Sequence, residues 1–116
     1  MTENELQARL EKAVEMVREA IEERGGILDI DKKPDLTWNG TARLPSGKLM
    51  LSSRKTGKQA KPEDTKPVLQ LSVDLIFEGR LLARLMFYST KTEIELPGGA
   101  HKPFGHGGIT RAFEAL

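Results

Sequence analysis

Hydrophobic residues near the start of the chain recur at spacings of three and four, the period of an α-helix. They are Leu6, Leu10, Ala13, Val14, Val17 and Ile21. Thr2 and Glu5 have the spacing of a capping box, and Gly25 and Gly26 supply the glycine that commonly follows a helix. The pattern therefore predicts a long N-terminal helix. Its broad apolar stripe favours packing on the protein's own sheet over the narrower seam of a coiled coil.

After Gly26 the hydrophobic period changes to two, which is typical of β-strands. Alternating runs at 68–77 and 80–89 flank Glu78-Gly79, which predicts a long hairpin. Earlier in the chain, Asn39-Gly40 lies between "LTW" and "TARL", and this pair is typical of a two-residue hairpin turn. Residues 44–48 read as a further turn, and "KTEIEL" as a further strand.

The last part of the sequence is rich in glycine and proline over 97–108, which predicts a loop before a short C-terminal helix in "ITRAFEAL". The whole chain, 1–116, has the length of one domain. We expect an α+β fold in which the N-terminal helix packs on an antiparallel sheet of five or six strands. Short connections make this sheet a meander of hairpins.

Charge is unevenly distributed along a chain whose net charge is only +1. Residues 43–67 hold seven Lys and Arg against Glu63 and Asp64, a local balance of +5. Within this region, 54–66 has the composition of a flexible, basic loop. A concentration of cations of this kind can bind a negatively charged partner.

The candidate nucleic-acid-binding residues are the cations of this region and the nearby tryptophan. They are Arg43, Lys48, Arg54, Lys55, Lys58, Lys61, Lys66 and Trp38. Lys and Arg side chains contact phosphates, and an indole can stack on a base. The alternative interpretation is a solvated loop without a ligand, because lysine, proline and glycine are also typical of linkers.

Candidate chemistry elsewhere is sparse. The chain has no cysteine, which excludes disulfides and thiolate sites. His101 and His106 follow Glu93 and Glu95, but this spacing is a weak signal for a metal site, and the two acids fit a solvated strand face. The serines lack a nucleophile-elbow context. We therefore expect a protein that is not an enzyme and has no metal or cofactor.

Two functions are consistent with this sequence. The first is a small nucleic-acid-binding accessory protein that contacts the phosphate backbone through the basic loop. The second is a protein-interaction module, an adaptor or inhibitor subunit, that uses a sheet edge or the N-terminal helix. Ile76, Leu82 and Met86 are expected on the outer sheet face, so a homodimer or the C-terminal helix is expected to cover them. A polar N-terminus and the lack of a long apolar run predict a cytoplasmic protein without a membrane partner.

Overall fold

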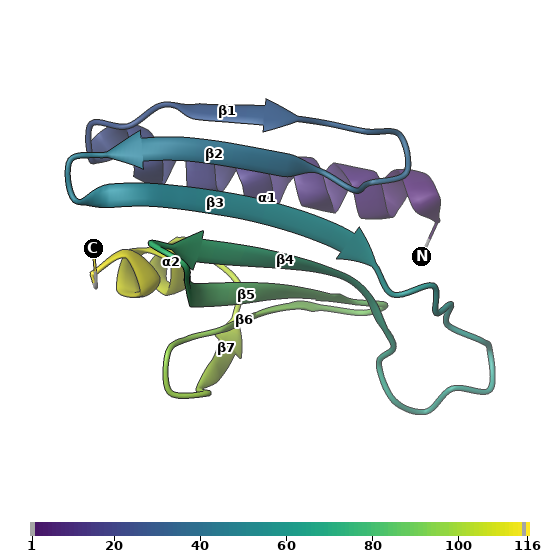
Figure 1. Ribbon diagram of the computed structural model, residues 1–116. Helices are drawn as coiled ribbons and strands as arrows, with labels where there is room; N and C mark the ends of the chain where they lie inside the picture. Colours follow the sequence, from purple (N-terminus) through teal and green to yellow (C-terminus); the bar gives the residue numbers. More distant parts are fainter. Residues whose placement is uncertain (1, 115) are drawn as a thin grey trace.

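The computed structural model describes residues 2–114 and 116. It has an N-terminal helix, an antiparallel sheet and a short C-terminal helix, so the predicted α+β class is confirmed (Figure 1). The helices are α1 (Glu3–Glu23) and α2 (His106–Phe113). The strands are β1 (Leu28–Asp31), β2 (Asn39–Leu44), β3 (Gly47–Lys55), β4 (Leu69–Phe77), β5 (Arg80–Tyr88), β6 (Thr92–Glu95) and β7 (His101–Pro103).

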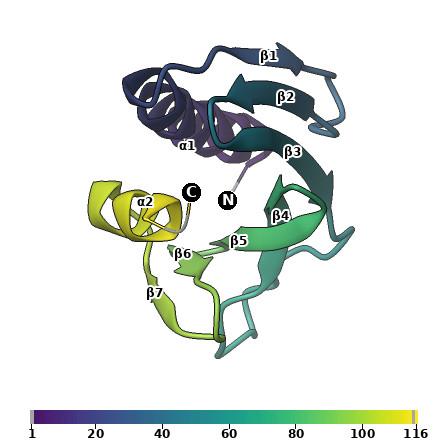
Figure 2. The same ribbon diagram turned by 60° about the vertical axis from the view of Figure 1, so that its left-hand side comes forward.

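The described strands form one sheet in which each strand pairs antiparallel with the next along the chain. The sheet curves, and both helices lie on its concave side (Figure 2). Within residues 2–114 and 116 there are seven strands, whereas the sequence predicted five or six. The additional strand, β7, lies within the segment predicted to be a loop at 97–108, where Pro103 is opposite Glu93 in β6. The helix α2 also begins inside that segment, at His106.

The two helix ends follow the sequence signals. The Thr2 side chain accepts a hydrogen bond from the Glu5 backbone N–H at 3.1 Å, which caps α1 at its first turn. At the other end Gly25 has φ +83°, the left-handed conformation that glycine adopts without strain. The apolar stripe of α1 is buried against the concave face of the sheet, as predicted.

The core fills the space between the helices and the sheet. Strand residues that point to this concave side include Leu49, Leu51, Leu71, Val73, Leu75, Leu85, Phe87 and Ile94, all buried. The helix α2 adds Ile109, Ala112 and Phe113 to the same cluster. Because α2 lies on this side, the expectation that it covers the outer face of the sheet is wrong.

The predicted Asn39-Gly40 turn is wrong, whereas the Glu78-Gly79 turn is confirmed. Glu78 and Gly79 both have positive φ, as a two-residue hairpin requires. Asn39 and Gly40 instead lie in β2, where they are opposite Ser52 and Leu51 of β3.

The loop that replaces the predicted turn spans 32–38. Leu36 adopts φ +65° there, and the Asp35 carboxylate accepts a hydrogen bond from the Thr37 backbone N–H at 3.0 Å. Leu36 and Trp38 are buried. Because their side chains must reach the core, the chain reverses direction within 32–38, before Asn39 and Gly40.

No helix within the described part of the chain is long and apolar enough to cross a membrane.

Candidate nucleic-acid interface

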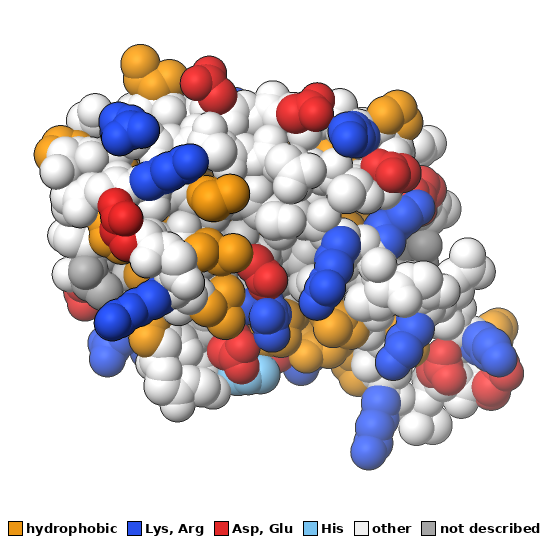
Figure 3. Space-filling view, in the orientation of Figure 1, with side chains coloured by type: hydrophobic (Ala, Val, Ile, Leu, Met, Phe, Trp, Pro, Cys, Tyr) orange, Lys and Arg blue, Asp and Glu red, His pale blue; other side chains and the backbone are white. Residues whose placement is uncertain are grey.

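The seven cations that the sequence singled out lie at two separate places on the structure. Arg43 of β2 is directly opposite Lys48 of β3, beside the turn that joins these strands. Both are exposed. Lys48 and Arg54 are six strand residues apart, about 20 Å at the usual rise per residue. Figure 3 shows Lys and Arg side chains at upper left, over the β2–β3 turn, and others on the projecting segment at lower right. The expected single basic surface is therefore divided.

The second group begins inside β3, because the strand continues to Lys55. The predicted start of the loop at residue 54 is therefore wrong, and irregular chain begins at Thr56. Arg54 and Lys55 are consecutive strand residues, so their side chains point to opposite faces of the sheet. Lys55 lies on the helix side, where its Nζ forms an ion pair with Glu3 Oε1 at 2.8 Å.

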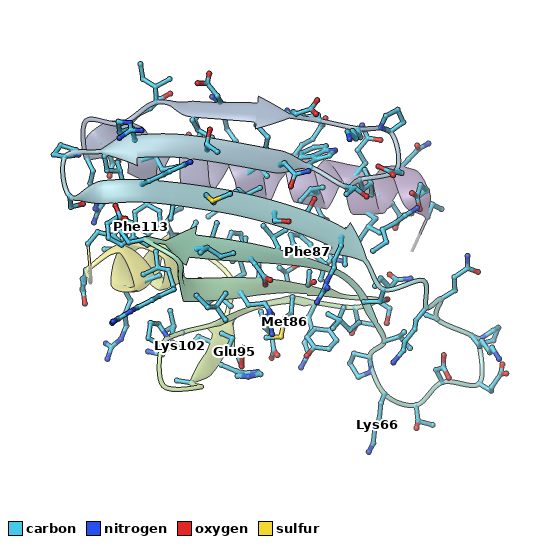
Figure 4. All side chains as sticks on the ribbon, in the orientation of Figure 1. Lys66, Met86, Phe87, Glu95, Lys102 and Phe113 are labelled. Atoms are coloured by element: carbon cyan, nitrogen blue, oxygen red, sulfur yellow. The ribbon has the colours of Figure 1, made fainter. Side chains whose placement is uncertain are left out.

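The irregular segment at 56–67 is exposed along its whole length and projects beyond the end of the sheet (Figure 1). It carries Lys58, Lys61 and Lys66, and Figure 4 shows Lys66 extending away from the body of the protein. Some of its hydrogen bonds are local. The Lys58 backbone N–H donates to Thr56 Oγ1, and the Lys61 backbone N–H donates to Asp64 Oδ2 at 2.6 Å.

Within the described residues, Lys55 is the only one of the seven cations that forms an ion pair. The other six are exposed side chains that form no ion pair with an acid among residues 2–114 and 116. Residues 54–67 hold five cations against Glu63 and Asp64, a balance of +3, and Glu3 offsets one further charge. The projecting end of the molecule is therefore positive, but less so than the count over 43–67 suggested.

Trp38 does not belong to this surface. The residue is 1% exposed, and its Nε1 donates to the Lys33 carbonyl at 2.9 Å. Its backbone N–H donates to Ser53 Oγ at 2.8 Å, and the Ser53 hydroxyl donates in turn to the Leu36 carbonyl at 2.7 Å. An indole buried in this way is a core residue, so the hypothesis that Trp38 stacks on bases is not retained.

His101 lies between two carboxylates on the outer face. Its Nε2 is 3.2 Å from Glu95 Oε2 and its Nδ1 is 3.8 Å from Glu93 Oε1. The two acids approach different ring nitrogens, which are on opposite sides of the imidazole, so the three side chains do not converge on one point. No group of three metal-binding side chains occurs in the described residues.

Sequence reasoning missed two residues beside the basic segment. The sequence singles out Thr2 and Glu5 at this helix start but not Glu3, which forms the ion pair with Lys55 from the first turn of α1. Strict alternation over 68–77 would place Gln70 on the outer face of the sheet, opposite to the face of Leu69 and Leu71. A register shift between Leu69 and Leu71 interrupts that alternation, and Gln70 is 8% exposed. Alternation alone contains no signal for such a bulge.

A comparison with known protein families, with curated proteins and with solved structures finds no match for this chain.

Proposed function

We propose that the protein is a small, non-enzymatic nucleic-acid-binding accessory protein that contacts the phosphate backbone through the basic segment at 54–67. The observation that carries this proposal is that most cations of this segment are exposed and unpaired among the described residues. Arg54, Lys58, Lys61 and Lys66 are exposed and have no ion pair with the described acids. Cations of this kind are free to replace the counterions of a phosphate chain.

The location of the segment also supports the proposal. The chain at 56–67 extends past the end of the sheet, so a bulky polymer can approach it without meeting the body of the protein. Arg43 and Lys48, about 20 Å away, form a second cationic point that a longer strand can reach. Contacts with phosphates position a nucleic acid but carry no sequence information. We therefore expect binding with little dependence on sequence.

A fluorescence-anisotropy titration with labelled single- and double-stranded oligonucleotides tests the proposal. If three phosphates are neutralised on a single strand, log K should fall with log salt concentration with a slope of about −2. Between 50 and 200 mM salt the affinity should then fall by about 15-fold. The absence of micromolar, salt-dependent binding at low ionic strength would end the proposal.

A protein partner, with the chain as an adaptor or inhibitor subunit, is the alternative function, and exposed apolar side chains favour it. Ile27, Met50 and Leu81 are 72%, 45% and 47% exposed. Met50 of β3 is opposite Ile76 of β4, and Ile76 is opposite Leu81 of β5. Met50, Ile76 and Leu81 therefore form a continuous apolar row across the three strands. Rows of exposed apolar residues often mark interaction sites.

This row also bears on the proposed homodimer. Leu82 and Met86 are only 6% exposed in the single chain, so they need no further cover. On this face the exposed apolar side chains are those of the row from Met50 to Leu81. Size-exclusion chromatography with light scattering tests a dimer through this face. A Met50→Gln/Leu81→Gln variant, which leaves the net charge unchanged, should become monomeric and leave oligonucleotide binding unchanged.

A further inference from the structure

A hollow lies between α1, the start of β6 and the connection from β7 into α2. Its volume is about 460 Å³, within the usual range for small-ligand sites. None of residues 54–67 lines it, so it is separate from the basic segment. The lining residues include Arg9, Lys12 and Met16 of α1, Thr92 of β6, and Phe104 and His106 of the connection into α2.

The charged side chains of this hollow are those of Arg9 and Lys12. The two residues are three apart on α1, so their side chains are neighbours on one face of the helix, where like charges repel each other. No Asp or Glu of the described residues lines the hollow. The chain at 97–113, which supplies the wall opposite α1, contains no acid. An anion between the two side chains would therefore be favourable.

The Arg9 guanidinium is already held in position by the fold. Its Nη1 donates to the Tyr88 carbonyl at 2.8 Å, and its Nη2 donates to the Thr92 hydroxyl. The guanidinium carbon is 5.6 Å from the centre of the Phe87 ring. Burial lowers the pKa of Arg9, because the cation has lost part of its hydration. A cation that is fixed in advance loses little conformational entropy when it binds an anion.

We propose that this hollow binds a small phosphate monoester whose organic part is apolar. Arg9 and Lys12 carry two positive charges, which match the charge of a phosphate monoester at neutral pH. The half-buried side chains of Met16 and Phe104 supply apolar surface for the organic part. Lys12 and His106 are exposed and Arg9 is half-buried, so a ligand in the hollow can reach each of these groups.

The first turn of α2 adds hydrogen-bond donors at the edge of the hollow. Its N-cap is Gly105, so this turn has no side-chain cap, and it contains no acidic residue. The backbone N–H groups of a first helical turn have no partner within the helix and can donate to an anion. This site lies outside the proposed nucleic-acid contact and does not depend on it.

The experiment is an amide NMR titration of the full chain with three probes. Phenyl phosphate carries the anion and an apolar ring, inorganic phosphate only the anion, and phenol only the ring. Phenyl phosphate should shift the backbone signals of Met16, Thr92 and His106. It should bind at least about tenfold more tightly than inorganic phosphate, a factor that corresponds to burial of about 60 Å² of apolar surface. Phenol should bind more weakly than phenyl phosphate. Equal affinity for phenyl phosphate and either other probe overturns the inference, and so does the absence of these shifts.

Two lysine variants locate the bound anion. Lys12→Gln and Lys61→Gln each remove one exposed positive charge, and glutamine is a good helix former, so both variants should fold. Lys12→Gln should lower the affinity for phenyl phosphate about two- to fivefold, as expected for an exposed ion pair. Lys61→Gln should leave it unchanged. An unchanged affinity in Lys12→Gln, or an equal loss in the two variants, overturns the inference. Neither result affects oligonucleotide binding at 54–67, which is measured separately.

Discussion

Lys55 Nζ lies 2.8 Å from Glu3 Oε1, which joins the end of β3 to the first turn of α1. Both side chains are partly exposed, so the pair contributes little to stability. The pair matters for the basic segment at 54–67, because one of the five cations of this segment, Lys55, already has an acidic partner. Both residues also line a hollow beside residues 57–60.

Replacement of Glu3 by Gln should therefore increase the affinity for single-stranded oligonucleotides at low salt by about two- to threefold, since it releases Lys55 for a phosphate. Glu11→Gln, farther along α1, removes the same charge without releasing Lys55 and serves as the control. Anisotropy titrations at 50 mM salt measure both. If the affinity of the two variants increases equally, the change in net charge explains the increase and the release of Lys55 from Glu3 does not.

The single tryptophan reports on the core and not on the ligand. Because Trp38 is buried, its emission should be that of an indole shielded from water, and iodide should quench it weakly. Addition of a saturating oligonucleotide should leave the emission unchanged. Trp38→Ala should lower the free energy of unfolding by about 3–5 kcal/mol. Emission that a bound oligonucleotide quenches would contradict the assignment of Trp38 to the core.

Two neighbouring glycines of α2 should respond in opposite ways to alanine. A Cβ at Gly108 would lie 2.8 Å from Ile94 Cγ2, and this branched side chain has little freedom to move. Gly108→Ala should therefore cost about 1–3 kcal/mol. A Cβ at Gly107 meets no atom of the described residues within 4 Å, so Gly107→Ala should stabilise the helix by about 0.5–1 kcal/mol. Thermal denaturation measures both, and equal shifts would show that α2 does not pack on Ile94.

The loop at 32–38 contains a carboxyl group that should titrate at low pH. The hydrogen bond from the Thr37 backbone N–H holds the pKa of Asp35 below its usual value of 3.8, with smaller contributions from the Thr37 side chain and from Lys33 and Lys55. A carboxyl whose pKa is lower in the folded state favours folding above its unfolded pKa, and this contribution is lost as pH falls through the folded pKa. A carbon-detected NMR titration should find the Asp35 midpoint below 3.8. A midpoint at or above that value would mean that the Thr37 bond does not persist in solution.

Most of the fold could be predicted because local signals and burial agree. The stripe of α1, its Thr2 cap and the Glu78-Gly79 turn are each set by residues close together in sequence. The Asn39-Gly40 pair shows the limit of such signals. Its turn propensity is overridden because Leu36 and Trp38 are buried, which extends the loop at 32–38 and leaves Asn39 and Gly40 in β2.

The candidate site was predicted less completely, because the composition of 43–67 does not reveal that its cations lie at two separate places on the structure. Arg43 and Lys48 are close in sequence to Arg54, but β3 extends between them and carries the two groups apart. The burial of Trp38 and the pairing of Lys55 with Glu3 depend on contacts between distant parts of the chain. The bulge at Gln70 likewise depends on the register of β4 against β5.

The most direct test of the account compares two double variants with the same change in net charge. Lys58→Glu/Lys61→Glu reverses two cations of the projecting segment, and Lys12→Glu/Lys102→Glu reverses two exposed cations on α1 and β7. At 50 mM salt, the first variant should lose at least about tenfold in affinity for a single-stranded oligonucleotide and show a shallower salt dependence. The control should lose far less. Equal losses in the two variants, or binding by Lys58→Glu/Lys61→Glu that matches the wild type, would contradict the claim that the segment at 54–67 holds the phosphate chain.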